Sequence, residues 1–237
     1  MRSCSAAARA LPLLCLWLVG CSGLFQSKAK PEQVYFLRAP AVATSAPSAQ
    51  PADSTAAAPA AAAVPMPASL RVARALANPG LDTSHIMLVQ TDHRMNFYSG
   101  SRRPAPVTRL VEALAVETLR ATGAWTSVED STSPFPSDYL LQIHVRRFEA
   151  EYTEGSGAPV VHVVLDCVAG RRQGREVLAT FTASGTAAAA ANRQADVVAA
   201  FEQATGTALQ ALSQQAERAV RADLPPREIT RDPTEPH

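Results

Sequence analysis

Few side chains in this sequence have the type and spacing that catalysis needs. Glu149, Glu151 and Glu154 form a carboxylate cluster, and paired carboxylates are typical of general acid and base catalysis. They extend an alternating, strand-like segment into a glycine turn, so we interpret them as solvated side chains. Ser156 lies between two glycines but lacks the strand-to-helix context of a nucleophilic serine. No catalytic residue is assigned, and the sequence does not predict an enzyme.

The histidines and cysteines do not have the spacing of a metal site. The five histidines contain no HExxH motif. His162 and Asp166 share one face of a predicted strand, but about 13 Å of strand separates them, which is too far to hold one ion. Three of the four cysteines lie within the first 21 residues, which excludes a disulfide framework. Cys167 lies in an apolar strand pattern and is predicted to be a small buried residue. We predict no metal and no cofactor.

The residues around Cys21 point to a covalent modification. Arg2 and Arg9 precede an apolar run, Leu11 to Val19, that is too short to span a bilayer and is typical of a signal peptide. The run ends in Leu18-Val19-Gly20-Cys21, which resembles the bacterial lipobox. The resemblance implies that residues 1–20 are a lipoprotein signal peptide and that Cys21 becomes the acylated first residue. Its chains, such as palmitate, would anchor the protein firmly in a membrane.

Two other interpretations of this beginning stay open: an ordinary secretory signal with an incidental cysteine, or a cytosolic protein with an apolar start. The residue after Cys21 is Ser22, whereas an Asp there would, by the rule for such lipoproteins, favour the inner membrane. We therefore expect attachment to the outer membrane, facing the periplasm, in preference to inner-membrane anchoring.

The composition predicts one folded domain behind a low-complexity spacer. The 237 residues are 47% hydrophobic and carry a net charge of +1, which gives no reason to expect nucleic-acid binding. Residues 39–69 are dominated by Ala and Pro, with Asp53 as the only charge, and are predicted to be a disordered linker. Residues 21–33 form a tether, residues 221–237 a disordered tail, and residues 70–220 the domain.

Val34-Tyr35-Phe36-Leu37 is an apolar, β-type segment that has two open assignments. Either the whole chain up to Ser69 is tether, or residues 34–38 form the first strand and the linker is an excursion between strands. Closing a loop of that length costs only about 3 kcal/mol, so the second arrangement is energetically accessible.

The pattern from Leu70 onward predicts strands and one helix. Strands are expected over Leu70–Leu76 and Ile86–Gln90, with Asn78-Pro79-Gly80 as a turn between them. Residues 91–94 are expected to turn the chain into a further strand, Met95–Tyr98. Apolar residues then recur at helical spacing between Pro104 and Gly123, at Val107, Leu110, Val111, Leu114, Thr118 and Leu119.

The second half of the domain predicts an antiparallel meander and a long helix. Trp125–Glu129 is expected to be a short strand, followed by strands over Tyr139–Phe148, Val160–Val168 and Val177–Ser184. The alternation changes parity at Arg147 to Phe148, which predicts a β-bulge or the edge of the sheet. The helix is expected over Gln194–Arg221, with an apolar stripe of Val198, Phe201, Thr205, Ala208, Leu209, Leu212 and Ala216. The fold class is α+β, an antiparallel or mixed sheet with two amphipathic helices on one face.

Arg102 and Arg103 stand just before the first helix, where the helix dipole disfavours cations. A solvated pair is one interpretation. The other is an anion or an acidic partner bound at this corner by Arg102 and Arg103, with Tyr98 nearby.

The order of these elements resembles the ABC-type transport auxiliary lipoproteins, the paraquat-inducible protein C-like family. The matching features are Leu18 to Cys21, Val34 to Leu37, the hairpin with Tyr98, the two helices and the Trp125–Val128 and Tyr139–Phe148 strands. Two features depart from the family pattern. Members usually carry a tryptophan where this chain has Arg102 and Arg103, and the Ala/Pro insertion after Leu37 is unusually long.

The resemblance implies a non-enzymatic, lipid-anchored periplasmic component of an envelope transporter that moves lipids. The implied partners are a substrate-binding protein of the mammalian-cell-entry type, a permease and an ATPase, and a homo-oligomer is a further expectation. Two alternatives stay open: a carrier with a pocket for an acyl chain, and a lipoprotein of cell-envelope assembly.

Overall fold

The computed structural model describes residues 32–39, 65–155 and 157–225. Within these residues nine strands and two long helices form a single α+β unit, as the sequence predicts. The elements in chain order are β1 (Gln33–Val34), β2 (Met66–Val72), β3 (Leu76–Ala77), β4 (His85–Val89), β5 (Met95–Arg102), α2 (Val107–Ala121), β6 (Trp125–Glu129), β7 (Tyr139–Glu151), β8 (Val160–Arg171), the 3₁₀ turn η1 (Gln173–Arg175), β9 (Glu176–Ala188) and α3 (Gln194–Asp223).

Strand β7 is the centre of a mixed sheet. Along one edge it pairs in parallel with β2, β3 and β4 in succession, and β5 and β6 extend this half as β1-β5-β4-β7-β2-β6. Along its other edge β7 pairs antiparallel with β8, which pairs with β9. The meander β7–β8–β9 is therefore confirmed, and it contains the longest strands of the sheet.

Of the two predicted causes of the change in parity, the structure shows a bulge in β7. Its pairing with β8 shifts register between Val145 and Arg147, so that Val145 faces Leu165 and Arg147 faces Val164. Before the bulge Ile143 and Val145 point into the core, and after it Phe148 and Ala150 do. One extra residue thus re-aims the second half of the strand.

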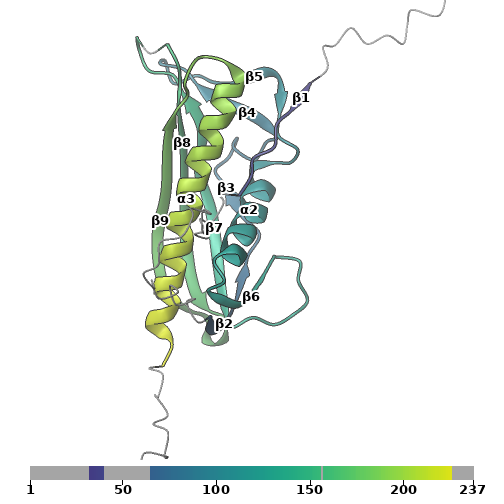
Figure 1. Ribbon diagram of the computed structural model, residues 1–237, viewed down its shortest axis with the longest axis vertical. Helices are drawn as coiled ribbons and strands as arrows, with labels where there is room; N and C mark the ends of the chain where they lie inside the picture. The colour runs from purple at the N-terminus through teal and green to yellow at the C-terminus, as the bar shows by residue number, and fades with distance from the viewer. Residues whose placement is uncertain (1–31, 40–64, 156, 226–237) are drawn as a thin grey trace, which may run out of the picture. The chain divides into compact units, whose positions relative to one another are not determined.

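Both helices lie on the same face of the sheet (Figure 1). All six apolar positions predicted for α2 are buried, although the helix begins at Val107, after both prolines. The Asp82 carboxylate accepts hydrogen bonds from the backbone N–H and the hydroxyl of Thr108, which caps the first turn. In α3, Phe201 stacks on Phe148 of β7, with ring centroids 5.3 Å apart.

The helix α3 approaches β9 most closely at Gly185. A Cβ atom at this position would stand 1.9 Å from the carbonyl oxygen of Ala204 and 2.9 Å from the backbone nitrogen of Ala208. Only a residue without a side chain fits there. At the far end of α3, Asp223 accepts a hydrogen bond from the Tyr139 hydroxyl and pairs with Arg171, which ties the helix to β7 and β8.

Several element boundaries differ from the sequence expectation. Strand β2 begins at Met66, inside the Ala/Pro-rich stretch, because Met66 and Ala68 are buried while Pro67 points outward. The expected strand Leu70–Leu76 is divided into β2 and the short β3. Helix α3 extends to Asp223, two residues beyond the predicted end. In its apolar stripe Val197 is fully buried, whereas Val198 is only half-buried.

The segment at residues 34–38 has a strand at its start. Gln33 and Val34 pair in parallel with Ser101 and Arg102 of β5, and the Tyr35 N–H donates to the Arg102 carbonyl. Tyr35 and Leu37 pack against the core. The signal peptide, the lipobox residues Leu18, Val19 and Gly20, the acylation candidate Cys21, residues 40–64 of the linker and residues 226–237 of the tail lie outside the described residues.

Candidate docking surface

Neither α2 nor α3, the two long helices of the described residues, covers the opposite face of the sheet (Figure 1). Its residues follow from the strand registers, because side chains directly opposite each other point to the same side. On β8 this outer row is Val160, His162, Val164, Asp166 and Val168, all half-buried, and on β9 it is Thr180, Thr182, Ser184, Thr186 and Ala188, all exposed. The outer face is therefore a wide polar surface with aliphatic side chains between the charged ones.

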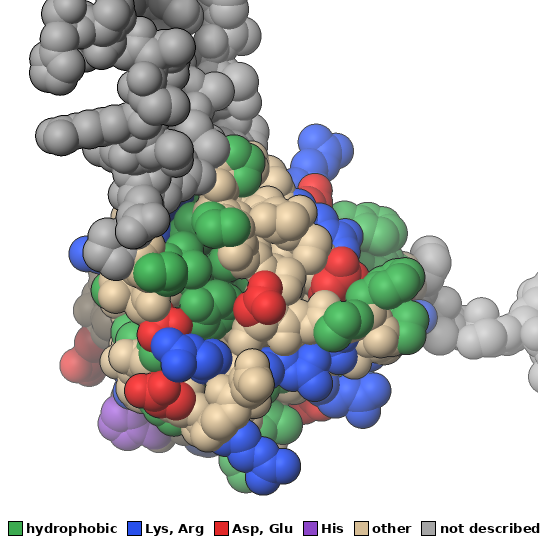
Figure 2. Space-filling model, turned by 90° about the horizontal axis from the view of Figure 1, so that it is seen from below, with side chains coloured by type: hydrophobic (Ala, Val, Ile, Leu, Met, Phe, Trp, Pro, Cys, Tyr) green, Lys and Arg blue, Asp and Glu red, His purple; other side chains and the backbone are tan. Residues whose placement is uncertain are grey.

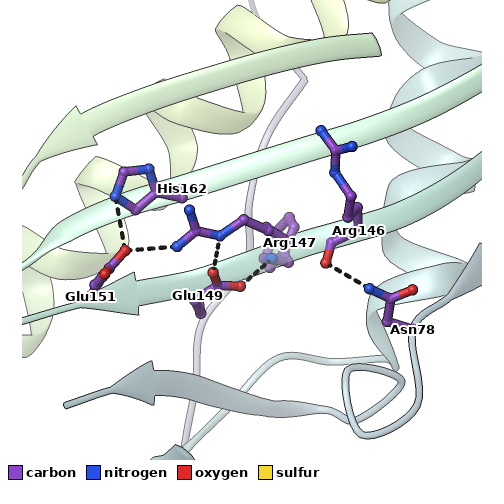
Figure 3. A network of polar contacts seen from close by, with 7 residues as sticks. Asn78, Arg146, Arg147, Glu149, Glu151 and His162 are labelled. Carbon is purple, nitrogen blue, oxygen red and sulfur yellow. Dashed lines mark hydrogen bonds and ion pairs between the residues drawn. The ribbon is translucent and has the colours of Figure 1, made fainter. Parts of the chain in front are cut away.

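A network of charged side chains occupies the middle of this face (Figure 3). Arg147 pairs with Glu149 through its Nε atom and with Glu151 through its Nη2 atom, the latter at 2.7 Å. The other oxygen of Glu149 accepts the Phe148 N–H at 2.7 Å. His162 of β8 places its Nε2 atom 3.4 Å from Glu151. One guanidinium therefore joins two carboxylates of one strand, and a histidine of the next strand lies against the second.

The network corrects the interpretation of Glu149 and Glu151 as solvated side chains, whereas Glu154 is exposed, as expected. Glu149 is only 6% exposed, and it is held by Arg147 and by a backbone N–H. The hydrogen bond from Arg147 lowers the pKa of Glu151. Burial alone would lower the pKa of Arg147. The hydrogen bonds from Arg147 to Glu149 and Glu151 outweigh burial, so the pKa of Arg147 is raised. The two carboxylates therefore share one guanidinium, an arrangement that suits a structural network.

A second ion pair extends the polar surface toward β9. Arg146 lies 3.5 Å from Asp166 of β8, whose Oδ1 atom also accepts a hydrogen bond from Thr182 at 2.8 Å. The Arg146 carbonyl accepts from the side chain of Asn78 at 3.2 Å. Figure 2 looks at the molecule from its lower end, and there too acidic and basic side chains are interspersed.

The corner before α2 differs from its sequence expectation at Arg103. This side chain is only 3% exposed, and its guanidinium donates to the carbonyls of Thr83 and His85 and lies 4.9 Å from the Phe148 ring centroid. Burial lowers its pKa to about 10, an effect that Asp82 opposes. Arg103 therefore faces the core and is not a solvated side chain. Its backbone carbonyl partners and the aromatic ring, all distant in sequence, stabilise this burial.

Tyr98 and Arg102 point to opposite sides of β5. The Tyr98 hydroxyl lies 2.8 Å from that of Tyr152, which in turn donates to Asn192. Partial burial and this contact raise the pKa of Tyr98. Arg102 is exposed and opposite Val34 and His85. The structure does not bring Tyr98, Arg102 and Arg103 together as one anion site, so of the three only Arg102 is presented outward.

An apolar patch, formed by Val34, Met95 and Phe97, was not predicted from the sequence. All three side chains are exposed, Met95 by 52% and Phe97 by 51%. The His85 ring stacks against Phe97, with centroids 5.2 Å apart. The only sequence signal was the alternation of Met95 and Phe97 in a short strand, which does not reveal which face stays uncovered.

The described residues bring together no group of three His, Cys, Asp or Glu side chains that could hold a metal ion. Cys167 is buried, as predicted, and burial raises the pKa of its thiol to about 12. A polar cleft of about 250 Å³ lies between α2 and the loop after β6, lined by Arg109, Glu112, Arg120 and Asp130 among others. Of the helices in the described part of the chain, neither is both long and apolar enough to cross a membrane.

The described residues form an α+β layer with helices on one face and an ordered polar surface on the other. Residues 46–230 match the ABC-type transport auxiliary lipoprotein components, and the chain belongs to this family. The match confirms the resemblance inferred from the sequence. It does not include the lipobox or β1.

Several solved structures are similar to this chain, and the first one named here shares its fold. Protein XCC0632 from Xanthomonas campestris, of the DUF330 family, is 27% identical with a TM-score of 0.63, over 70% of this chain and 92% of that one. A lipoprotein from Neisseria meningitidis is 14% identical with a TM-score of 0.35, over 64% and 99%. The PelC dodecamer from Paraburkholderia phytofirmans is 17% identical with a TM-score of 0.33, over 61% and 88%. A comparison with curated proteins gives no match.

Proposed function

We propose that this protein is a non-enzymatic, lipid-anchored periplasmic component of an ABC-type envelope transporter of the mammalian-cell-entry class. Its role is to dock to the transporter assembly through the outer face of the sheet, and the transported molecules are lipids. The family match over residues 46–230 carries the proposal. The outer face supports it, because its charges are already held in place by ion pairs and a partner need not order them on binding.

Anchoring through Cys21 is the first part of the proposal. The lipobox-like Leu18-Val19-Gly20-Cys21 supports acylation, and Ser22 supports the outer membrane, with the domain facing the periplasm. Membrane fractionation of cells that produce the full chain tests this part. We expect the wild-type chain in the outer-membrane fraction and Cys21→Ser in the soluble periplasmic fraction. Equal membrane association of the two chains would contradict the anchor.

Docking through the outer face is the second part. The expected partners are a mammalian-cell-entry-type substrate-binding protein, a permease and an ATPase. Co-purification from detergent-solubilised membranes tests this part with Ser184→Tyr, which adds a large ring at an exposed position of the outer face. We expect about a tenfold loss of recovered partner, the size of a disrupted interface centre. The matched control is Gln210→Tyr, exposed on α3, and equal recovery of partner by both variants would overturn docking through this face.

The same purification separates this function from the two alternatives. Lipid extraction from the purified chain should yield only the anchor's own acyl groups if the domain docks, and an additional bound lipid if it is a carrier. The charged lining of the α2 cleft does not favour an acyl chain. Recovery of cell-wall or secretion components in place of a permease and an ATPase would instead favour envelope assembly. Two differently tagged copies in one preparation would reveal a homo-oligomer.

A further inference from the structure

We propose that the apolar patch of Val34, Met95 and Phe97 lies on the surface of the membrane that holds the acyl anchor and gives the domain a second contact with lipid. The proposal rests on the acylation of Cys21 proposed above. It adds a defined orientation of the domain to the proposed docking function, because an anchor alone leaves a tethered domain free to turn.

The strand registers place the three patch residues on one face. Phe97 is opposite Met87 and Met95 is opposite Val89, while His85 and Arg102 are opposite each other. Val34 of β1 is opposite Arg102. Val89 of β4 is also opposite Glu151 of the outer face, so Met95, and Phe97 two residues later, lie on that face. Val34 and Arg102 adjoin them through His85, which is opposite Arg102 and stacks on Phe97. An exposed aromatic ring, a methionine and an arginine together suit the interface between acyl chains and anionic headgroups.

The pairing of β1 places Val34 of the patch at the start of the described domain. Gln33 and Val34 pair with Ser101 and Arg102, the last two residues of β5, and His85, which is opposite Arg102, stacks on Phe97 of the patch. Only 12 residues of sequence lead from Cys21 to Gln33, and they reach at most about 40 Å when fully extended. A lipid at Cys21 therefore limits how far Val34 can lie from the bilayer, and the exposed apolar side chains near Val34 are within reach of a lipid surface.

The test uses the acylated full chain with one reporter thiol. Cys4 and Cys15 leave with the signal peptide, Cys21 is blocked by its thioether, and Cys167 is 1% exposed with a raised pKa, so an introduced cysteine is the reactive one. Met95→Cys is labelled with an environment-sensitive NBD dye, and the protein is reconstituted into phosphatidylethanolamine–phosphatidylglycerol vesicles. The control label is Thr180→Cys, on the same sheet face about 30 Å away along the strands.

We expect the dye at position 95 to shift its emission to the blue, to brighten several-fold, and to be quenched by lipids that carry a nitroxide near the headgroup, whereas the dye at position 180 does not respond. Adding Phe97→Glu to the Met95→Cys chain should abolish the quenching, and adding Thr186→Glu should not. A blue shift without quenching by the lipid nitroxide would mean that a second copy or the chain's own tether covers the patch. Unchanged emission from the dye at position 95 would mean that this position stays in water. Either result would overturn the proposal.

A failure of the anchor proposal and a failure of the patch proposal give different results. Mass spectrometry of the same preparation reports the acyl groups on Cys21. A chain without them would contradict the proposed anchor and the patch proposal with it. An acylated chain that floats with the vesicles but shows no quenching at position 95 would contradict the patch alone.

Discussion

The two faces of the meander β7–β8–β9 are built from neighbouring residues but follow different rules. The inner face consists mainly of aliphatic side chains such as Val163, Leu165 and Ala183, with aromatic residues such as Phe148, and the helices exclude it from water. The outer face alternates charged, threonine and valine residues, most of which remain half-buried or exposed. The inner face therefore determines whether the domain folds, and the outer face is free to determine what it binds.

The difference also shows how each face uses charge. On the outer face Glu149 is nearly buried, yet it is matched by Arg147. On the inner side the guanidinium of the buried Arg103 is held by two backbone carbonyls and an aromatic ring. A charge on the outer face can be replaced together with its partner, whereas Arg103 is built into the core.

The largest effect is expected where α3 meets β9. Gly185→Ala places a methyl group 1.9 Å from the Ala204 carbonyl, so the helix must move away from the sheet. We expect a loss of about 3 kcal/mol or more in the free energy of unfolding, measured by urea denaturation. Gly157→Ala is the control, because its Cβ would meet no atom within 4 Å. Similar midpoints for the two variants would show that the helix does not pack as described.

Adjacent residues of β8 allow a direct comparison of the faces. Leu165→Ala removes a fully buried side chain and should cost about 2–5 kcal/mol of unfolding free energy. Val164→Ala, one residue earlier but on the outer face, should cost less than about 1 kcal/mol, because its side chain is already half-exposed. Thermal and urea unfolding of both variants measure the difference. Equal losses would mean that the outer face is covered as well as the inner one.

The charged network should contribute a smaller, pH-dependent effect. Arg147→Met leaves Glu149 without its cation and should cost about 1–2 kcal/mol near neutral pH. The folded pKa of Glu151 is lowered, so its stabilisation is present above its unfolded pKa of about 4.3 and is lost as the pH falls through the folded value. Unfolding measured between neutral and strongly acidic pH should therefore show a shallower acid limb in Arg147→Met. An unchanged acid limb would mean that the ion pair does not form in solution.

The smallest effect is expected at the junction of β2 and β7. The Ser69 hydroxyl and backbone N–H both donate to Asp138 and lower its pKa, the hydroxyl bond being the larger cause. Ser69→Ala should raise the pKa of Asp138 toward its ordinary value and reduce stability by no more than about 1 kcal/mol. Carboxyl chemical shifts followed by NMR over acidic pH report this change. Ser184→Ala, which lies far from Asp138 on β9, should leave that pKa where it is in the wild type.

Local patterns predict the regular part of this fold and miss its long-range parts. The alternation in β7, β8 and β9 predicts the meander and its bulge, because each strand pairs with its neighbour in sequence. The start of β2 at Met66 could not be predicted, because its composition equals that of the linker and only burial against β6 distinguishes it. The parallel pairing of β1 with β5 likewise joins segments that are far apart in the chain.

The candidate surface was predicted less well than the fold. The sequence named Glu149 and Glu151 but could not show that Arg147 neutralises both, because that depends on the bulge. The sequence named Arg102 and Arg103 as a pair. In the structure Arg102 is exposed, and the Phe148 ring and the carbonyls of residues 83 and 85 contact the guanidinium of Arg103. Contacts of this kind come from residues remote in sequence, and no local pattern encodes them.

The bulge at Arg146 also determines how β7 responds to the gain or loss of one residue. Deleting one residue between Val145 and Phe148 would exchange the two sides of β7 beyond that point. Phe148 would then face water instead of the Phe201 ring, and the Glu149 side chain would point into the hydrophobic core beneath α3. Strands β4 and β8 pair with this half of β7 and would have to slip along with it. A one-residue insertion or deletion here is therefore a far more severe change than most substitutions. At Gly157, in contrast, an added side-chain atom would meet no other atom within 4 Å.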